Sequence, residues 1–323
     1  MKAIVQDTYG SLDVLELRDI AKPAPGPDDV LVKVHAAGVD PGVWHLTTGM
    51  PYLLRIMGFG LRAPKVRVRG LDVAGRVEAV GANVTRFKPG DEVFGTCEGS
   101  FAEYGCAPAH KFAPKPARLT FEQAAAVAIS GFTALQGLRD QGKVQPGQKV
   151  LVIGAAGGVG TYAVQLAKSY GAHVTGVCST GKTDLVRSIG ADEVVDYSAE
   201  DVTDGARRYD LVLDIAGHRP VKRLRRALTP RGTLVIVGSE APGRWFGGVD
   251  RLLGALALAP FVRHRLRGLF SAERAEDLEF LRKAIEDGSL TPVVDRTFPL
   301  PEVAEAVRYL QEGRARGKVV ITV

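Results

Sequence analysis

Cysteine is scarce in this chain of 323 residues: it occurs three times, at Cys97, Cys106 and Cys178, and no two lie at a metal-ligand spacing. This content is typical of a reduced, cytoplasmic protein and excludes a disulfide framework or a cysteine-rich metal site. Long hydrophobic runs are also missing, because the most apolar stretch, 252–262, is much shorter than the ~20 residues of a membrane span. Met1 leads directly into a strand-like segment, so we expect no signal peptide.

Signatures of nucleic-acid binding are lacking too, although the chain is basic. Its formal net charge is +6 and its pI is about 9.2, with basic clusters at 222–226 and 263–267. Both clusters are predicted to lie in helices, where such runs usually form a solvated face. Since no zinc-finger or RNA-binding motif accompanies them, we expect no nucleic-acid partner.

The length predicts two domains, because one core rarely serves so many residues. Up to roughly residue 115 the pattern predicts short strands bounded by Gly and Pro. Thr120 and Gln123 form a capping-box pattern at the start of a predicted helix, 121–128, and from there strands alternate with helices as in a parallel sheet. We predict strands at 150–153, 173–178, 193–196, 211–214 and 233–237, helices at 161–170 and 183–189, and a tail of helix 273–286, strand 293–298, helix 301–311 and strand 317–323.

The most informative motif joins the predicted strand 150–153 to the predicted helix 161–170. A small-residue loop lies between them, with Ala155 where the G-x-G-x-x-G fingerprint has its first glycine. A strand, a tight turn and a helix N-terminus bring several backbone N–H groups to one point, which suits a pyrophosphate. This context predicts a dinucleotide site formed by Ala155, Gly157, Gly158, Val159 and Gly160.

Six stretches in this order resemble the medium-chain dehydrogenase/reductase superfamily, and more narrowly its zinc-independent, quinone oxidoreductase-like branch. They are AGVDP (37–41), GLDVAG (70–75), KPGDEV (88–93), GSFAEY (99–104), AAGGVG (155–160) and GRARGK (313–318). The resemblance implies an α/β fold that combines a Rossmann doubly wound parallel sheet with a β-rich GroES-like catalytic domain. It places the catalytic domain at 1–122, the NADP-binding Rossmann domain at 123–266 and a return to the catalytic domain at 267–323.

The resemblance also makes an absence informative. Zinc-dependent relatives hold a catalytic metal with three side chains, and the matching positions here carry Asp40, Leu71 and Ile129. Leu and Ile have no lone pair, whereas catalytic zinc takes three protein ligands. We therefore expect no metal. Without a Lewis acid, an already polarised acceptor is easier to reduce than an unactivated alcohol is to oxidise.

The cofactor is expected to be NADPH. An NAD-preferring site places an acid about 20 residues past the glycine loop, whereas Ser179 occupies that position here. Related quinone reductases contact the 2′-phosphate with residues that match Lys182 and Tyr197, and a Thr matching Thr133 lies beside the nicotinamide. Gly238 and Lys318 complete the predicted cofactor-binding set. The alternative for Lys182 is a solvated loop lysine.

Three residues are candidates for the chemistry, which the cofactor itself mainly supplies. Asp40 replaces an Asn common in quinone reductases and is expected to orient the nicotinamide ribose or the substrate. His45 matches a proton-relay His of zinc-dependent relatives, and histidine is the side chain that ordinarily exchanges a proton near working pH. Tyr52 is a second proton donor. The alternative for His45 is a hydrogen-bonding loop residue without a catalytic role.

The resulting hypothesis is a zinc-free NADPH-dependent oxidoreductase that passes hydride to a small electrophile, either a quinone or an α,β-unsaturated carbonyl. One alternative is a zinc-free alcohol dehydrogenase or carbonyl reductase on the same scaffold. Another is a non-catalytic NADPH-binding or RNA-associated protein. Residues 241–270 resemble an amphipathic insertion that either packs on the fold or roofs the substrate pocket. A homodimer is expected to pair through 233–237, taken as an uncovered edge strand.

Overall fold

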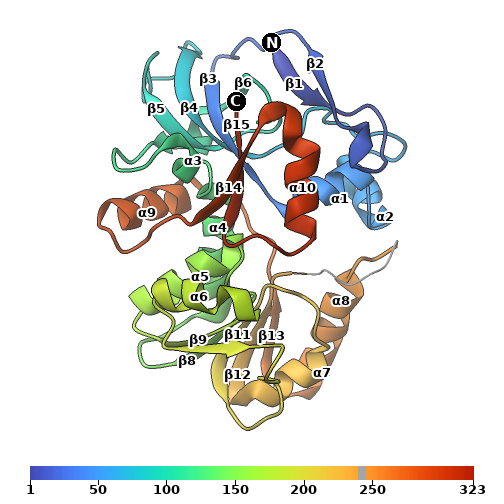
Figure 1. Ribbon diagram of the computed structural model, residues 1–323, viewed down its shortest axis with the longest axis vertical. Coiled ribbons are helices and arrows are strands. Elements are labelled where there is room, and N and C mark those ends of the chain that lie inside the picture. The colour runs from blue at the N-terminus through green and yellow to red at the C-terminus, as the bar shows by residue number, and fades with distance from the viewer. Residues whose placement is uncertain (239–244) are drawn as a thin grey trace. The chain divides into compact units, whose positions relative to one another are not determined.

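The computed structural model describes residues 1–238 and 245–323 and divides the chain into two units (Figure 1). Unit 1 comprises Met1–Ile129 and Glu273–Val323, and unit 2 comprises Ser130–Ala272. The boundaries expected after residues 122 and 266 lie inside α3 (Phe121–Ala124) and β13 (Arg265–Gly268). Because α3 packs on strands of unit 1 and β13 pairs within the sheet of unit 2, both boundaries fall a few residues later.

Unit 1 is the β-rich unit, and its sheets are largely antiparallel. A hairpin-like pair, β1–β2, accompanies a seven-stranded sheet in the order β14-β15-β3-β4-β5-β7, with β6 paired to β3. The tail of the chain returns here, since Val319 of β15 lies opposite Val39 of β3. The strands are β1 (Lys2–Val5), β2 (Glu16–Asp19), β3 (Asp29–Val39), β4 (Asp72–Val80), β5 (Glu92–Thr96), β6 (Tyr104–Pro108), β7 (Phe112–Pro114), β14 (Val294–Pro299) and β15 (Lys318–Thr322). The helices are α1 (Pro41–Thr48), α2 (Tyr52–Leu54), α3, α9 (Ala275–Glu286) and α10 (Val303–Gln311).

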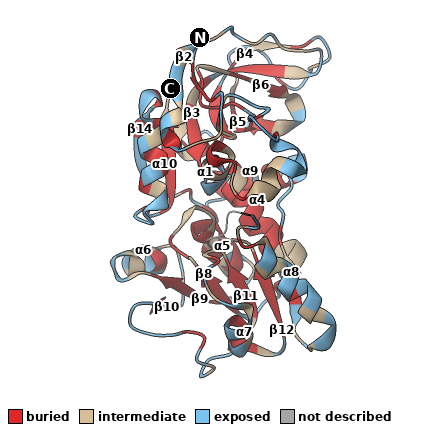
Figure 2. Ribbon diagram, turned by 90° about the vertical axis from the view of Figure 1, so that its right-hand side faces the viewer, coloured by how far each residue is buried: buried red, intermediate tan, exposed pale blue. Residues whose placement is uncertain are grey.

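Unit 2 is a parallel six-stranded sheet in the order β10-β9-β8-β11-β12-β13. This is the strand order of a doubly wound dinucleotide-binding fold, in which the order reverses between the first and fourth strands. Figure 2 shows the central strands buried. The strands are β8 (Lys149–Ile153), β9 (His173–Cys178), β10 (Glu193–Asp196), β11 (Tyr209–Asp214), β12 (Leu228–Ile236) and β13, and the helices are α4 (Ala128–Gln136), α5 (Gly158–Ser169), α6 (Thr183–Ser188), α7 (Val221–Leu224) and α8 (Val249–Leu258).

Several predicted elements differ from the observed ones. The capping box of Thr120 and Gln123 is present, but the helix that it starts ends at Ala124 and α4 begins separately at Ala128. The basic cluster 263–267 is not helical, because Arg265–Gly268 pairs with β12 as a strand. For the same reason the predicted edge strand 233–237 is an interior strand. No helix among the described residues is long and apolar enough to cross a bilayer.

Candidate functional site

The glycine-rich loop of unit 2 lies at the carboxyl end of β8. Gly154 has φ +90°, and both Gly154 and Ala155 donate their N–H groups to the carbonyl oxygen of Val177, at 3.1 and 3.0 Å. A Cβ at Gly160 would lie 2.1 Å from the Gly154 oxygen, so a side chain there would force the helix away from the strand. A Cβ at Gly157 would meet only the Gly154 oxygen, at 3.6 Å, so space remains over this part of the loop.

Helix α5 makes this loop suitable for an anion. It begins at Gly158, three residues before the predicted start, so the whole second half of the fingerprint belongs to the first turn. The first N–H groups of an α-helix have no partner within the helix, so those of Gly158, Val159 and Gly160 can bind a phosphate. Ala155 fits its position because Gly154, which the sequence analysis did not single out, takes the left-handed conformation. The residues present therefore fit the pyrophosphate of a dinucleotide cofactor.

Ser179, Lys182 and Tyr197 lie near one another at the carboxyl ends of β9 and β10. Cys178 of β9 is opposite Asp196 of β10, so Ser179 and Tyr197 leave the sheet together. The N–H of Tyr197 donates to the Cys178 oxygen at 3.1 Å, and the N–H of Lys182 donates to the Ser179 oxygen at 2.9 Å. The Tyr197 side chain is exposed. These backbone bonds hold the three predicted residues at one corner of the sheet.

Asp196 adds an acid to this corner that sequence counting missed. Its carboxylate accepts a hydrogen bond from Thr180 Oγ1 at 2.5 Å and another from the Ser198 N–H at 2.9 Å. These bonds, led by that from Thr180, lower the pKa of Asp196, so the group is ionised at neutral pH. The acid comes from the neighbouring strand and not from β9, which is why a count along the chain from Gly160 could not find it.

Thr133 and Gly238 occupy other positions in unit 2. Thr133 lies on α4, is buried, and donates its hydroxyl hydrogen to Ser271 Oγ at 3.2 Å. Gly238 follows β12, where a Cβ would lie only 1.7 Å from the carbonyl oxygen of Ile215. Only glycine therefore allows β12 to leave the sheet so close to the end of β11, at the carboxyl edge where doubly wound sheets bind ligands.

The described part of the segment 241–270 packs on the sheet of unit 2; residues 241–244 lie outside the described residues. The guanidinium of Arg251, on α8, pairs with the fully buried carboxylate of Asp214 at the end of β11. Arg251 also donates to the carbonyl oxygens of Arg219, at 2.9 Å, and of Gly238, at 3.3 Å. Burial raises the pKa of Asp214 and the nearby guanidinium opposes this. The ion pair therefore anchors α8 to the carboxyl edge of the sheet.

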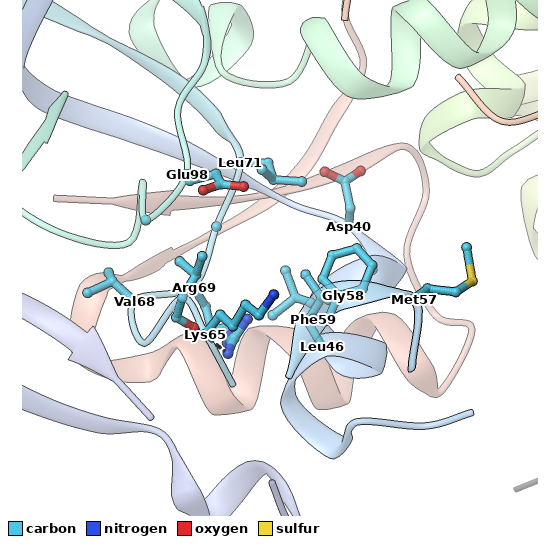
Figure 3. Close-up of a pocket in the computed structure, with 15 residues that line it drawn as sticks. Asp40, Leu46, Met57, Gly58, Phe59, Lys65, Val68, Arg69, Leu71 and Glu98 are labelled. Carbon is cyan, nitrogen blue, oxygen red and sulfur yellow. Dashed lines mark hydrogen bonds between the residues drawn. The ribbon is translucent and has the colours of Figure 1, made fainter. Parts of the chain in front are cut away.

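Unit 1 contains a pocket with a volume of about 330 Å³, within the range of small-molecule sites (Figure 3). It lies beside α1 and β4 and includes the π turn Arg55–Phe59. Four charged residues line it, namely Asp40, Lys65, Arg69 and Glu98. Most of the remaining wall is apolar, with side chains from Val43, Leu46, Met57, Phe59, Val66, Val68 and Leu71.

Asp40 enters the pocket from a buried cluster of charges. Lys318 Nζ lies 2.6 Å from Asp40 Oδ1 and 2.8 Å from Asp72 Oδ2. The Lys318 side chain is 2% exposed and that of Asp72 is fully buried, whereas that of Asp40 is 14% exposed. Asp72 Oδ1 also accepts a hydrogen bond from the Ile129 N–H at 2.8 Å. Lys318, predicted to contact the cofactor, thus has two carboxylate partners inside unit 1.

The ionisation of this cluster follows from burial. Desolvation raises the pKa of Asp72 to about 7, although the Lys318 ammonium opposes the shift. The two carboxylates raise the pKa of Lys318 to about 12 against the effect of burial. Above about pH 7 the Lys318 ammonium therefore faces an ionised Asp72, and this buried carboxyl group gains a proton as the pH falls through about 7.

The residues at the three positions that match the zinc ligands of zinc-dependent relatives do not fit a metal. Leu71 lines the pocket with an apolar side chain, and Ile129 contributes only its backbone N–H, to Asp72. Asp40 is bound by an ammonium that competes with any cation. Within residues 1–238 and 245–323, no three His, Cys, Asp or Glu side chains form a group suited to a metal ion.

His45 and Tyr52 lie close to the pocket in sequence but are not among its lining residues. His45 is on α1, and its Nδ1 lies 2.9 Å from the Met50 carbonyl oxygen. Since a carbonyl oxygen only accepts, Nδ1 carries the hydrogen in this bond and Nε2 is left to exchange a proton. The Tyr52 ring is partly buried and faces the Arg55 guanidinium at 4.8 Å.

Comparison with known proteins agrees with this geometry. A model described as alcohol dehydrogenase GroES-like domain matches residues 26–117, and one described as zinc-binding dehydrogenase matches residues 189–321. Human quinone oxidoreductase is 32% identical over an alignment of 340 residues, gaps included, and the alignment covers 99% of this chain and 97% of the relative. The chain belongs to the medium-chain dehydrogenase/reductase superfamily, in its quinone oxidoreductase-like branch.

Two further members of this superfamily extend the comparison. The 2-methylene-furan-3-one reductase of Solanum lycopersicum is 34% identical over 337 residues, which cover 99% of this chain and 79% of the relative. The solved structure of the quinone oxidoreductase from Coxiella burnetii is 30% identical with a TM-score of 0.85, and the match covers 100% of this chain and 99% of that one. The protein is accordingly a nicotinamide-dependent oxidoreductase with a GroES-like domain and a Rossmann-like domain.

Proposed function

We propose that this member of the superfamily is an NADPH-dependent, zinc-independent reductase whose acceptor is a quinone or an α,β-unsaturated carbonyl. The relatives named above are a quinone oxidoreductase and a reductase of an exocyclic enone, so both acceptor classes occur among similar chains. The bound nicotinamide supplies the hydride, and the protein supplies binding, orientation and a dry pocket.

The observation that carries this proposal is the ion pair between Asp40 and Lys318. In zinc-dependent relatives a metal at this place polarises the substrate oxygen, whereas here Asp40 is held by the Lys318 ammonium, beside the apolar Leu71. A pocket built in this way cannot stabilise an alkoxide through a Lewis acid. A conjugated carbonyl needs less help, because hydride addition to its β-carbon gives a delocalised enolate.

The cofactor is bound by the loop and first turn formed by Gly157–Gly160, and the choice of NADPH is assigned to Ser179, Lys182 and Tyr197. A hydroxyl, an ammonium and an accessible phenol at one corner of the sheet suit a phosphate group. The ionised Asp196 at the same corner repels a phosphate, so the preference depends on Lys182 outweighing this acid.

For the proton that completes enone reduction we propose His45 as the donor, with Tyr52 as the second candidate. His45 belongs to α1, which contributes Val43 and Leu46 to the pocket wall. Its Nδ1–H is fixed by Met50, so a proton is released from Nε2 of the protonated ring. A quinone needs no such donor, because hydroquinone oxygens exchange protons readily with solvent.

We also propose a homodimer and a cytoplasmic location. β12 cannot pair with a second copy, because β13 covers it, so we assign the dimer contact to the exposed edge at β13. Phe261 precedes this strand and Phe270 follows it in the sequence, and they are 84% and 75% exposed. Arg265 and Arg267 weaken pairing of the strand itself, so we assign the contact mainly to these aromatic side chains. The location rests on three free thiols, at Cys97, Cys106 and Cys178.

The deciding experiment follows NADPH oxidation by the purified protein across matched acceptors: a quinone, an enone and the corresponding saturated ketone. Turnover of the quinone or the enone, with the saturated ketone inert, supports the proposal. Reduction of the saturated ketone would indicate a zinc-free carbonyl reductase instead. Oxidation at the background rate with every acceptor, together with measurable NADPH binding, would indicate a non-catalytic protein.

A loop variant tests whether activity depends on the assigned cofactor site. In Gly157→Ala the added Cβ meets only the Gly154 oxygen, at 3.6 Å, so the fold is retained, but the methyl group occupies the space expected for the pyrophosphate. This variant should lose NADPH binding and turnover while keeping the circular dichroism of the parent protein. Gly90→Ala would be a poor control because Gly90 has φ +94°; Gly42→Ala would alter the pocket. Gly254→Ala, on the exposed side of α8 with nothing within 4 Å of a Cβ, is the matched control.

A further inference from the structure

The pocket of unit 1 contains a buried arginine without a carboxylate partner. Arg69 is a buried residue, with 5% of its surface exposed, and its Nε and Nη2 donate to two neutral oxygens: Gln6 Oε1 at 2.8 Å and the Val66 carbonyl at 2.6 Å. Among residues 1–238 and 245–323, Nη1 has no hydrogen-bond acceptor and the guanidinium makes no ion pair. A buried cation without a directly paired counter-charge is unfavourable. Burial lowers the pKa of Arg69, and the more distant Tyr9 and Glu98 oppose this shift without outweighing it.

Lys65 provides a second positive charge on the same pocket. Its ammonium is exposed and forms no ion pair within the described part of the chain, and its side chain lines the cavity together with that of Arg69 (Figure 3). The backbone that presents it is fixed, since its N–H donates to the Phe59 oxygen at 3.0 Å and the Tyr9 hydroxyl donates to the Phe59 and Gly60 oxygens. The guanidinium of Arg69 and the backbone that carries Lys65 are therefore held in place before any ligand arrives.

The acids on the pocket wall offset these charges only in part. Asp40 already has Lys318 as its counter-ion. Glu98 is exposed and forms no ion pair in the described chain, and Figure 3 draws it apart from both cations, towards Leu71. The pocket thus has a cationic region formed by Lys65 and Arg69, while much of the remaining wall is apolar.

We propose that this pocket selects acceptors that carry a carboxylate on an apolar body, with the carboxylate bound by Arg69 and Lys65. This proposal rests on the proposed reductase function and narrows its substrate class from enones in general to unsaturated carbonyl compounds that are also acids. The carboxylate accepts hydrogen bonds from the free edge of the guanidinium, which binds planar anions better than an ammonium alone does. The apolar wall contacts the hydrocarbon part.

The test compares 4-carboxybenzalacetone with its methyl ester, because the two share one enone and differ only at the remote carboxyl group, which is charged in the acid and methylated in the ester. The ratio of kcat/KM for the acid to that for the ester should exceed about ten, the effect of one charge-assisted contact. In Lys65→Gln and Arg69→Met the ratio should fall towards one, and in Glu98→Gln it should rise. Arg67→Gln is the matched control, since Arg67 is exposed, pairs with Asp7 and does not line the pocket, so its ratio should equal that of the parent.

Calorimetric titration of the cofactor-free protein with 4-phenylbutyrate, which cannot be reduced, separates failure of this proposal from failure of the reductase function. Binding that weakens at least about ten-fold in Lys65→Gln supports the carboxylate site, even if no enone is turned over and the reductase proposal falls. Equal kcat/KM for acid and ester, with no detectable phenylbutyrate binding, overturns the carboxylate site while the reductase stands. If Arg69→Met does not fold, Lys65→Gln and Glu98→Gln still decide the question.

Discussion

Lys318 Nζ lies 2.6 Å from Asp40 Oδ1, which joins the last strand of the chain to the residue that leads from β3 into α1. The contact turns Asp40 from a potential metal ligand into half of an ion pair at the pocket wall. Because Lys318 is also bound by the buried Asp72, the position of Asp40 depends on a cluster that solvent does not reach. The pocket that we assign to the substrate is therefore held partly by electrostatics.

Lys318→Met should destabilise the protein by roughly 3–5 kcal/mol, because it leaves two carboxylates near one another without a counter-charge. The measurement is the free energy of unfolding by urea. Lys22→Met, which removes an exposed ion pair with Glu78, should cost less than about 1 kcal/mol. Adding Asp72→Asn to Lys318→Met should restore part of the loss. If the double variant is as unstable as the single one, the lysine acts through packing and not through its charge.

The raised pKa of Asp72 predicts a pH dependence of stability. Its pKa rises from 3.8 to about 7 on folding, so the folded state binds this proton more tightly and the contribution of Asp72 to stability falls as the pH rises from about 4 to 7. In Asp72→Asn that decline should be smaller than in the parent protein. Unfolding free energies across this range provide the measurement, with Asp184→Asn, whose side chain is 99% exposed, as the control. Parallel curves for parent protein and Asp72→Asn would contradict the assignment.

Local sequence was enough to predict the strand, glycine turn and helix around Gly157–Gly160, because β8, the turn and α5 are consecutive and their signals add together. It was not enough for charges that meet across the fold. Lys318 and Asp40 are 278 residues apart, and neither position alone indicates that they pair. Asp196 was missed for a related reason: it reaches the corner of Ser179, Lys182 and Tyr197 through the register of β10 against β9.

The edge of the parallel sheet shows how a local pattern can mislead. The arginine-rich segment 263–267 is predicted from its sequence to be helical. It contains a single Leu between arginines, and so short an alternation of apolar and polar residues does not reveal a strand. Pairing of Leu266 with Leu234 of β12 decides its conformation, and this is a tertiary contact. Arg69 was likewise overlooked, because its importance comes from being buried beside a cavity without a carboxylate partner among the described residues.

The purified protein should contain no stoichiometric zinc and should keep its activity in a chelator. The physical reason is that Leu71 and Ile129 offer no ligand atoms and Asp40 is bound by an ammonium, whereas a catalytic zinc needs three protein ligands. Elemental analysis of the enzyme, before and after dialysis against a chelator, provides the measurement. About one zinc per chain, lost together with activity, would contradict this prediction.

Lys182→Ala should weaken NADPH binding by about ten-fold or more and leave NADH nearly unchanged, because a charge-assisted contact to the 2′-phosphate contributes ~1.5–3 kcal/mol. Fluorescence titration with both cofactors measures this. Lys149→Ala, at the amino end of β8, is the control and should change neither affinity. Equal weakening for both cofactors would show that Lys182 only supports the fold. Asp196→Asn should act in the opposite direction and strengthen NADPH, since it removes an ionised acid from the same corner.

His45→Phe is the most demanding test of the proposed chemistry. An enone that receives hydride becomes an enolate and must gain a proton, and general acid assistance typically contributes ~10²–10⁴-fold. If His45 is the donor, enone turnover should fall by at least ~10² while quinone turnover falls far less and NADPH affinity is kept. Tyr52→Phe, measured in parallel, should then have a small effect. Neither side chain lines the pocket, so the size of the loss decides the role of His45. A loss of enone turnover below ten-fold in His45→Phe would assign the proton to Tyr52 or to solvent. A loss of quinone turnover as large as that of enone turnover would show that His45 maintains the pocket through its bond to Met50.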